Sequence, residues 1–208
     1  MLENIRPMDI EKRSFEIITG LLGDRQLDPE NELVIKRAIH TTADFDYADN
    51  LVFSEHAVQK GLAALRSGCD IVTDTQMAKA GINKTILASL GGEVHCFMAD
   101  PDVAAEAKSR GVTRALVSME KAAALPKPCI FAIGNAPTAL ISLEHLMEEG
   151  KLSPALIIGV PVGFVNVVES KELIIEGNRT PYIIARGRKG GSNVAAAICN
   201  AMLYQIKR

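Results

Sequence analysis

The chain has 208 residues, of which 48% are apolar and 23% are charged, and its formal net charge at neutral pH is −2. A chain of this length and composition can bury one substantial core, so we expect a single domain over residues 1–208. The small net charge argues against a general nucleic-acid binder or a membrane-surface binder, because both classes usually carry a marked basic excess.

Neither a targeting segment nor a membrane span is expected. Residues 1–15 carry charges where a secretory signal peptide needs an apolar stretch. The longest apolar run, residues 155–165, contains Pro161 and is too short to cross a bilayer. The four cysteines are widely separated and form no C-x-x-C pair, which favours free thiols over a metal site or disulfides. We therefore expect a cytoplasmic protein.

In chain order, helices come first and an alternation of strands and helices follows. Three helices are predicted near residues 8–22, 29–40 and 54–66. Apolar runs typical of parallel strands covered on both faces lie at 70–73, 93–97, 129–133, 155–159 and 182–185. Further helices are predicted over 101–110, 136–149, 166–176 and 192–206. The pattern predicts an α/β fold with three α/β/α layers and a mostly parallel sheet of about five strands, preceded by N-terminal helices.

The unusual loops of the chain follow the predicted strands. They are DTQM (74–77), GNAPTAL (134–140), GVPVGFV (159–165) and ARGRKGGS (185–192). Because open α/β sheets bind ligands beyond the carboxyl ends of their strands, this clustering favours an active site.

GRKGGS (187–192) joins the last predicted strand to an alanine-rich helix. The first N–H groups of a helix have no intrahelical partner, and the helix dipole adds positive potential, so an anion is expected to bind here. The segment is neither the G-x-G-x-x-G of dinucleotide folds nor the phosphate loop G-x-x-x-x-G-K-S/T, so the anion need not be a nucleotide.

Taken together, ordered blocks of the sequence resemble one family. They are IGNAPTAL (133–140), PVGFV (161–165), ESKE (169–172) and GRKGGS (187–192), followed by Asn200-Ala201 in the last predicted helix. Further matches are Arg13-Ser14-Phe15, Arg37, His40, Asp74 and Thr113-Arg114. In order and spacing the chain is similar to precorrin-8X methylmutase, also called precorrin isomerase. The resemblance implies an isomerase of cobalamin biosynthesis that moves a methyl group from C11 to C12 of a corrin precursor, giving hydrogenobyrinic or cobyrinic acid. It also implies a homodimer with active sites near the interface.

His40 is the catalytic residue that the resemblance implies. It ends an apolar-spaced helix and precedes the polar turn Thr41–Asp44, so it can reach a cleft. Imidazole changes its protonation near neutral pH and can give a proton to the substrate. The competing interpretation is a helix-end histidine stabilised by the helix dipole.

The substrate implied by the resemblance is a flat apolar ring with several carboxylates, which arginines and backbone N–H groups suit. Surface ion pairs, ordinary turn chemistry and, for Ser14, a bond to its own helix are the alternatives. The predicted substrate-binding residues are Arg13, Ser14, Arg37, Asp74, Arg114, Gly134, Asn135, Arg186, Arg188, Lys189, Gly190, Gly191 and Ser192.

No metal site or cofactor of the protein's own is expected. No two histidines show metal-ligand spacing, and the acidic segment 44–55 lacks the glycine of a calcium loop. Cobalt, if present, would arrive inside the substrate; the Thr41–Asp44 continuation favours the cobalt-containing form. Two other classes stay open: a phosphate- or nucleotide-binding α/β enzyme, and a non-catalytic tetrapyrrole carrier that would not need His40.

Overall fold

The structure is a computed structural model that describes residues 5–207. Within them, a six-stranded sheet has the order β1-β6-β5-β4-β2-β3. All neighbouring strands are parallel except β1, which pairs antiparallel with β6 at one edge. The strands are β1 Leu51–Phe53, β2 Asp70–Thr73, β3 Val94–His95, β4 Cys129–Ile133, β5 Leu156–Gly159 and β6 Tyr182–Ala185.

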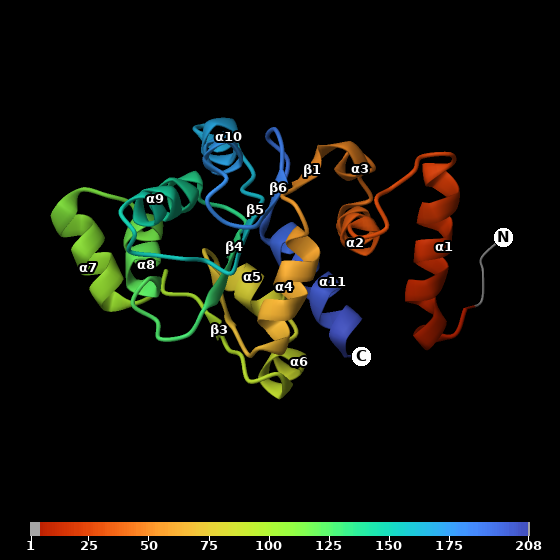
Figure 1. Cartoon of the computed structure of the whole chain (residues 1–208), viewed down its shortest axis with the longest axis horizontal. Helices are drawn as coiled ribbons and strands as arrows, with labels where there is room; N and C mark the ends of the chain where they lie inside the picture. Colours follow the sequence, from red (N-terminus) through yellow and green to blue (C-terminus); the bar gives the residue numbers. More distant parts are fainter. Residues whose placement is uncertain (1–4, 208) are drawn as a thin grey trace.

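Helices cover both faces of this sheet (Figure 1). One face is covered by α2 Glu32–Thr42, α4 Ala57–Arg66, α5 Gln76–Gly81, α6 Lys84–Ser89 and α11 Ser192–Ile206, and α1 Ile10–Leu22 packs against α2. The other face packs against α8 Arg114–Ala122, α9 Pro137–Glu148 and α10 Val167–Gly177, with α7 Pro101–Arg110 lying outside α8. Short η1 Pro7–Asp9 and α3 Tyr47–Asn50 precede α1 and β1. In Figure 1, α1 lies at the outer edge of the molecule, beyond α2.

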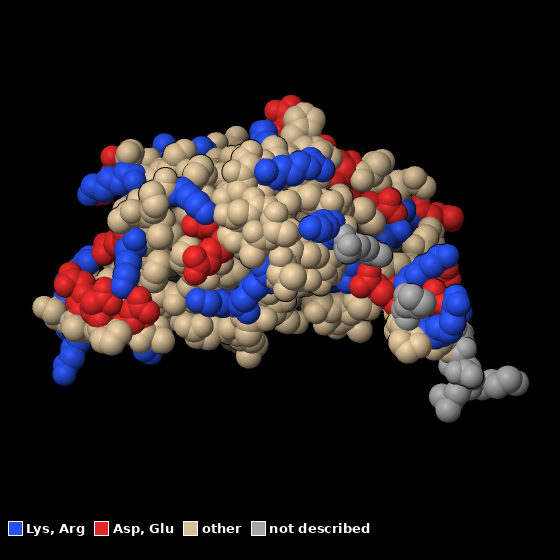
Figure 2. Space-filling model, turned by 90° about the horizontal axis from the view of Figure 1, so that it is seen from below, with Lys and Arg blue, Asp and Glu red and all other residues tan. Residues whose placement is uncertain are grey.

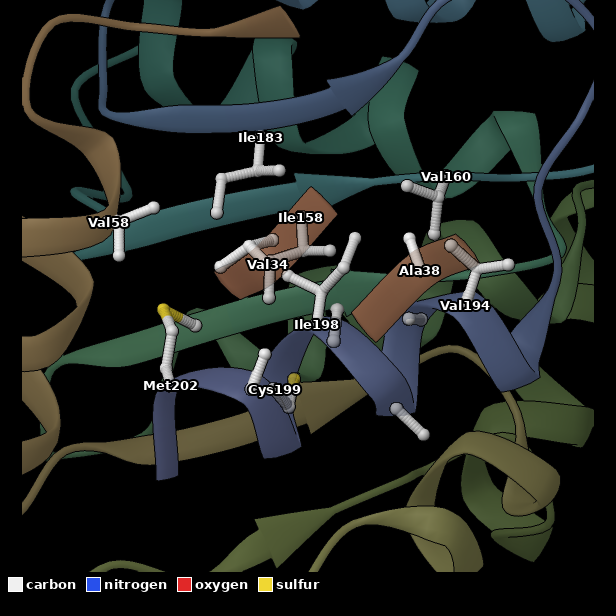
Figure 3. Packing of buried hydrophobic residues seen from close by; sticks show 14 of the residues in the cluster. Val34, Ala38, Val58, Ile158, Val160, Ile183, Val194, Ile198, Cys199 and Met202 are labelled. Carbon is white, nitrogen blue, oxygen red and sulfur yellow. The ribbon is translucent and has the colours of Figure 1, made fainter. Parts of the chain in front are cut away.

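The core is built from strands that are buried on both faces. Alternate residues of one strand enter different clusters: Ile158 packs toward α2 and α11, while Ile157 packs toward α9 and α10. Figure 3 shows the first cluster, in which Val34 and Ala38 of α2 meet Ile198 of α11 beneath β5 and β6. Central parallel strands need apolar residues at every position for this reason.

The predicted fold class is confirmed, with three local corrections. The sheet has six strands rather than about five, because β1 forms from three residues that gain their partners only by pairing with β6. The predicted strand 93–97 is reduced to Val94–His95. Four short helices, α3, α5, α6 and α8, were not predicted. The last three begin at a side-chain cap, supplied by Thr75, Asn83 and Thr113 respectively.

The surface carries both signs of charge. On the face shown in Figure 2, Lys and Arg side chains lie beside Asp and Glu, separated by broad uncharged areas. No helix within residues 5–207 is long and apolar enough to cross a membrane.

Candidate functional site

The carboxyl ends of β2 and β4 mark the point in the sheet where the connections diverge. The chain leaves β2 toward α5 on one face and leaves β4 toward α9 on the other. Strands whose connections diverge in this way open a cleft beyond their ends, and ligands of α/β proteins collect there.

Asp74 directly follows the end of β2. Its side chain is fully buried, with 0% exposure. One carboxylate oxygen accepts a hydrogen bond from Gly134 N at 2.8 Å, and the other accepts from Asn135 N at 2.8 Å and Ala136 N at 2.6 Å. Burial raises the pKa of Asp74, and the three backbone donors oppose that rise. In this structure, therefore, the carboxylate contacts the 134–136 loop.

The loop 186–192 packs directly on its neighbours. A Cβ at Gly190 would lie 2.0 Å from Val160 O, and one at Gly134 would lie 2.7 Å from the Cα of Ser192. Gly191 N donates to Val160 O at 2.8 Å, and the hydroxyls of Ser192 and Thr75 are hydrogen-bonded at 2.7 Å. The structure thus brings the predicted residues Asp74, Gly134 and 190–192 together at the N-terminus of α11, which begins at Ser192.

The predicted cations of this loop have different partners. Arg186 forms an ion pair with Glu172 at 3.0 Å. The ammonium of Lys189 contacts both Asp44 at 2.6 Å and Asp46 at 2.5 Å, and these carboxylates raise the pKa of Lys189. Because Asp44 lies in the turn after α2, this bridge ties the loop to the end of the helix that carries His40.

Arg188 has an aromatic neighbour. Its guanidinium lies 5.9 Å from the centroid of the Phe164 ring. Phe164 is 84% exposed and Val165 is 78% exposed, so the loop after β5 presents an apolar surface beside the cation. Such a combination suits a ligand with an apolar body and acidic side chains.

His40 lies in the last turn of α2, where its side chain is exposed. The left-handed C-cap Ala43 ends the helix and turns the chain away. The imidazole centroid is 5.6 Å from that of Phe15 on α1. A cavity of about 300 Å³ runs from His40 along α11, where it is lined by Asn193, Ala197 and Asn200.

A second cavity, of about 660 Å³, adjoins the first and shares Glu11, Arg37 and Tyr204 with it. Arg37 is paired with Glu11 through two hydrogen bonds of 3.1 and 3.0 Å, and its guanidinium lies 4.9 Å from the Phe15 centroid and 5.3 Å from that of Tyr204. Its buried Nε has no hydrogen-bond partner among the described residues. We call the two cavities together the His40 groove.

The predicted residues of α1, Arg13 and Ser14, are not among the residues that line this groove. Ser14 Oγ donates a hydrogen bond to Ile10 O at 2.9 Å. This bond within its own helix is the structural alternative to a contact with substrate. Arg13 lies 3.5 Å from Glu16 on the same helix. Neither arrangement tests a contact with substrate, so both residues remain predictions.

Arg114 lies away from the His40 groove of its own chain. It is the first residue of α8, on the other face of the sheet, and its guanidinium donates to Met98 O at 3.3 Å. The preceding Thr113 is hydrogen-bonded to Thr138 at 2.9 Å, which links Arg114 to the start of α9 and the GNAPTAL loop.

Several residues of the site were not predicted, among them Asn193 and Tyr204, which line the groove, and Lys171, which supports the loop. Asn193, Asn200 and Tyr204 recur at spacings of seven and four on the otherwise apolar α11, which places them on one helix face. That periodicity was a usable signal. Lys171 belongs to the ESKE block (169–172), but its burial could not be predicted, because that burial depends on the loop that covers it. No group of His, Cys, Asp or Glu suited to a metal occurs among residues 5–207.

Comparisons with known proteins agree with one another. The family model described as precorrin-8X methylmutase matches residues 9–205. The cobalt-precorrin-8 methylmutase of Salmonella typhimurium is 46% identical over 209 residues, covering 97% of both chains. That of Priestia megaterium is 44% identical over 198 residues, covering 95% of this chain and 88% of the relative. Among solved structures, precorrin-8X methyl mutase from Thermus thermophilus matches with a TM-score of 0.85 at 37% identity, covering 94% of this chain and 96% of that one. The chain therefore belongs to the precorrin-8X methylmutase family.

Proposed function

We propose that the protein isomerises cobalt-precorrin-8 to cobyrinic acid by moving a methyl group from C11 to C12 of the macrocycle, with His40 as the proton donor. The observation that carries this proposal is the position of His40, exposed at the end of α2 within a groove that α1 and α11 complete. The two sequence relatives compared above both bear the name of the cobalt substrate, which favours the cobalt-containing form.

The His40 groove suits a flat ring. The aromatic rings of Phe15 and Tyr204 line it together with the small side chains Ala196 and Ala197. Small residues on a helix face leave room for a ring to approach, and aromatic side chains supply apolar contact area. The substrate's carboxylates would extend toward Arg188 and the free N–H groups at the start of α11.

The reaction needs a proton but no redox partner. As the bond from the methyl carbon to C11 breaks, the bond to C12 forms, and the conjugated electrons of the ring rearrange. Protonation of the ring makes it electron-deficient, and the proton returns to the enzyme at the end. Substrate and product have the same composition, so no cofactor of the protein's own is proposed, and cobalt enters only within the substrate.

A homodimer is also part of this proposal. Ile10, Ile17 and Leu21 lie on one side of α1 and are 52%, 44% and 67% exposed, which is an unusual apolar surface for a free helix. A second copy could bury this side, which lies opposite the side of α1 that carries Phe15 and lines the His40 groove. We also expect the protein to act in the cytoplasm, where a soluble corrinoid intermediate would be its partner.

Mixing the purified protein with cobalt-precorrin-8 under anaerobic conditions tests the proposed function. Isomerisation changes the conjugation path, so absorbance must shift with turnover; the metal-free substrate is run in parallel. A spectrum that stays unchanged with both substrates contradicts the proposal. Binding without any spectral conversion would instead assign the protein to the tetrapyrrole carriers.

A further inference from the structure

Lys171 of α10 is a buried ammonium beneath the loop 186–192. Its side chain has 0% exposure. The Nζ atom donates to Gly187 O at 2.7 Å and to Lys189 O at 2.9 Å. Within residues 5–207 its recorded hydrogen-bond partners are therefore backbone carbonyls and not carboxylates. A buried ammonium that is not hydrogen-bonded to a carboxylate is costly, so its presence calls for a physical reason.

The two carbonyls that Lys171 holds belong to the residues on either side of Arg188. Arg188 O in turn accepts a hydrogen bond from Gly163 N at 3.2 Å. The main chain at 187–189 is thus held by the side chain of Lys171 and by a hydrogen bond from Gly163 in the loop after β5. This arrangement sets the direction in which Arg188 leaves the loop.

The charges of the loop give Lys171 a second role. Arg186 is neutralised by Glu172, and Lys189 is neutralised by Asp44 and Asp46. Arg188 has an aromatic ring as its recorded contact, and Lys171 has only carbonyls. The positive potential that an anion would meet at this loop therefore comes from Arg188, from Lys171 and from the N-terminus of α11.

We propose that Lys171 is the positioning residue of the 186–192 loop: its buried ammonium holds Gly187 and Lys189 by their carbonyl oxygens and supplies positive charge that the loop's ion-paired side chains do not. The proposal rests on the proposed function, because it assigns to this loop one carboxylate of the corrinoid. Lys171 touches no substrate and acts through the loop and Arg188.

The variant Lys171→Met removes the ammonium and keeps most of the apolar stem. We expect it to raise the Kd for cobyrinic acid and the KM for cobalt-precorrin-8 by about tenfold, the loss typical of one charge-assisted contact, while kcat changes much less. Lys171→Arg retains a charged donor and should recover part of the affinity. The matched control is Ile174→Val on the same helix, which trims a buried side chain without touching the loop.

A pH series separates charge from position and needs no variant to fold. Burial lowers the pKa of Lys171 to about 8, and the nearby Glu172 opposes this. Above that pH the neutral amine keeps two N–H donors for the two carbonyls but loses its charge. The other charged groups near the loop are Glu172, Arg186, Lys189, Asp44 and Asp46. Ion pairing raises the pKa of Arg186 and of Lys189 and lowers the pKa of Asp44, so these three groups stay charged between pH 7 and 9.

Wild-type affinity for cobyrinic acid should therefore fall between pH 7 and 9, and this fall should be absent in Lys171→Met. If Lys171→Met binds cobyrinic acid as tightly as the wild type at pH 7, or if both proteins show the same pH dependence, the proposal is overturned. An equal loss of affinity in Ile174→Val would also overturn it, because the effect would then follow stability alone. Failure of the proposed function looks different: the wild type itself would bind no corrinoid.

Discussion

Replacement of Asp74 by Asn should destabilise the protein, because the carboxylate accepts three backbone hydrogen bonds in a fully buried position. Oδ1 accepts from Gly134 N, and Oδ2 accepts from Asn135 N and Ala136 N. An asparagine amide has one oxygen, so its NH₂ group must face at least one of these N–H donors. The less damaging orientation puts the nitrogen toward Gly134.

The magnitude follows from the donors left without acceptors. In that orientation Gly134 N–H and one amide N–H are buried and unpaired, and each costs about 1–3 kcal/mol. Removing a buried charge offsets part of this cost, so we expect the free energy of unfolding to fall by about 2–4 kcal/mol. For a protein of this size that corresponds to a fall in Tm of about 4–16 °C.

Thermal unfolding followed by circular dichroism measures this change. Asp102→Asn is the matched control, since its carboxylate lies on the surface beside Lys121 and its loss should leave Tm close to that of the wild type. A folded Asp74→Asn protein that melts within about 2 °C of the wild type would refute the reasoning. The alternative, in which Asp74 contacts substrate directly, would then predict lost affinity at unchanged stability.

Other expected outcomes follow from the same site. His40→Ala should lower kcat by about 10²–10⁴-fold while corrinoid binding persists, because a general acid acts mainly in the transition state; single-turnover kinetics would show a near wild-type rate if His40 were structural. Gly190→Ala should lower Tm, since its Cβ would lie 2.0 Å from Val160 O, and an unchanged Tm would mean that the loop has room to shift. Arg188→Ala should weaken cobyrinic acid binding by about 1.5–3 kcal/mol if the contact is shielded from water; calorimetric titration would detect the change, and unaltered affinity would remove Arg188 from the site.

The central strands could be predicted from sequence because their apolar runs have no other stable environment. Residues 129–133 and 182–185 are strands with the predicted bounds, and both are buried at every position. Strand β1 could not be predicted in the same way. Its three residues carry too short a pattern, and its strand conformation depends on pairing with β6, more than 100 residues away along the chain.

The candidate site, too, could be predicted only in part. The loops at the carboxyl ends of the strands were identified from sequence, and the structure does bring Asp74, Gly134 and Ser192 together. The partners of the charged residues could not be predicted, because they lie far apart in the chain: Lys189 meets Asp44 across 145 positions. Composition shows how many charges there are, but only the fold determines which of them remain uncompensated.

The fate of the migrating methyl group tests the central claim most directly. Cobalt-precorrin-8 labelled with ¹³C at the C11 methyl group would be incubated anaerobically with the protein, and the product examined by ¹³C NMR. The account predicts that the label moves to C12 with the wild type and stays at C11, on the same time scale, with His40→Ala. A label that remains at C11 with the wild-type protein, or that moves as fast with His40→Ala, would contradict it.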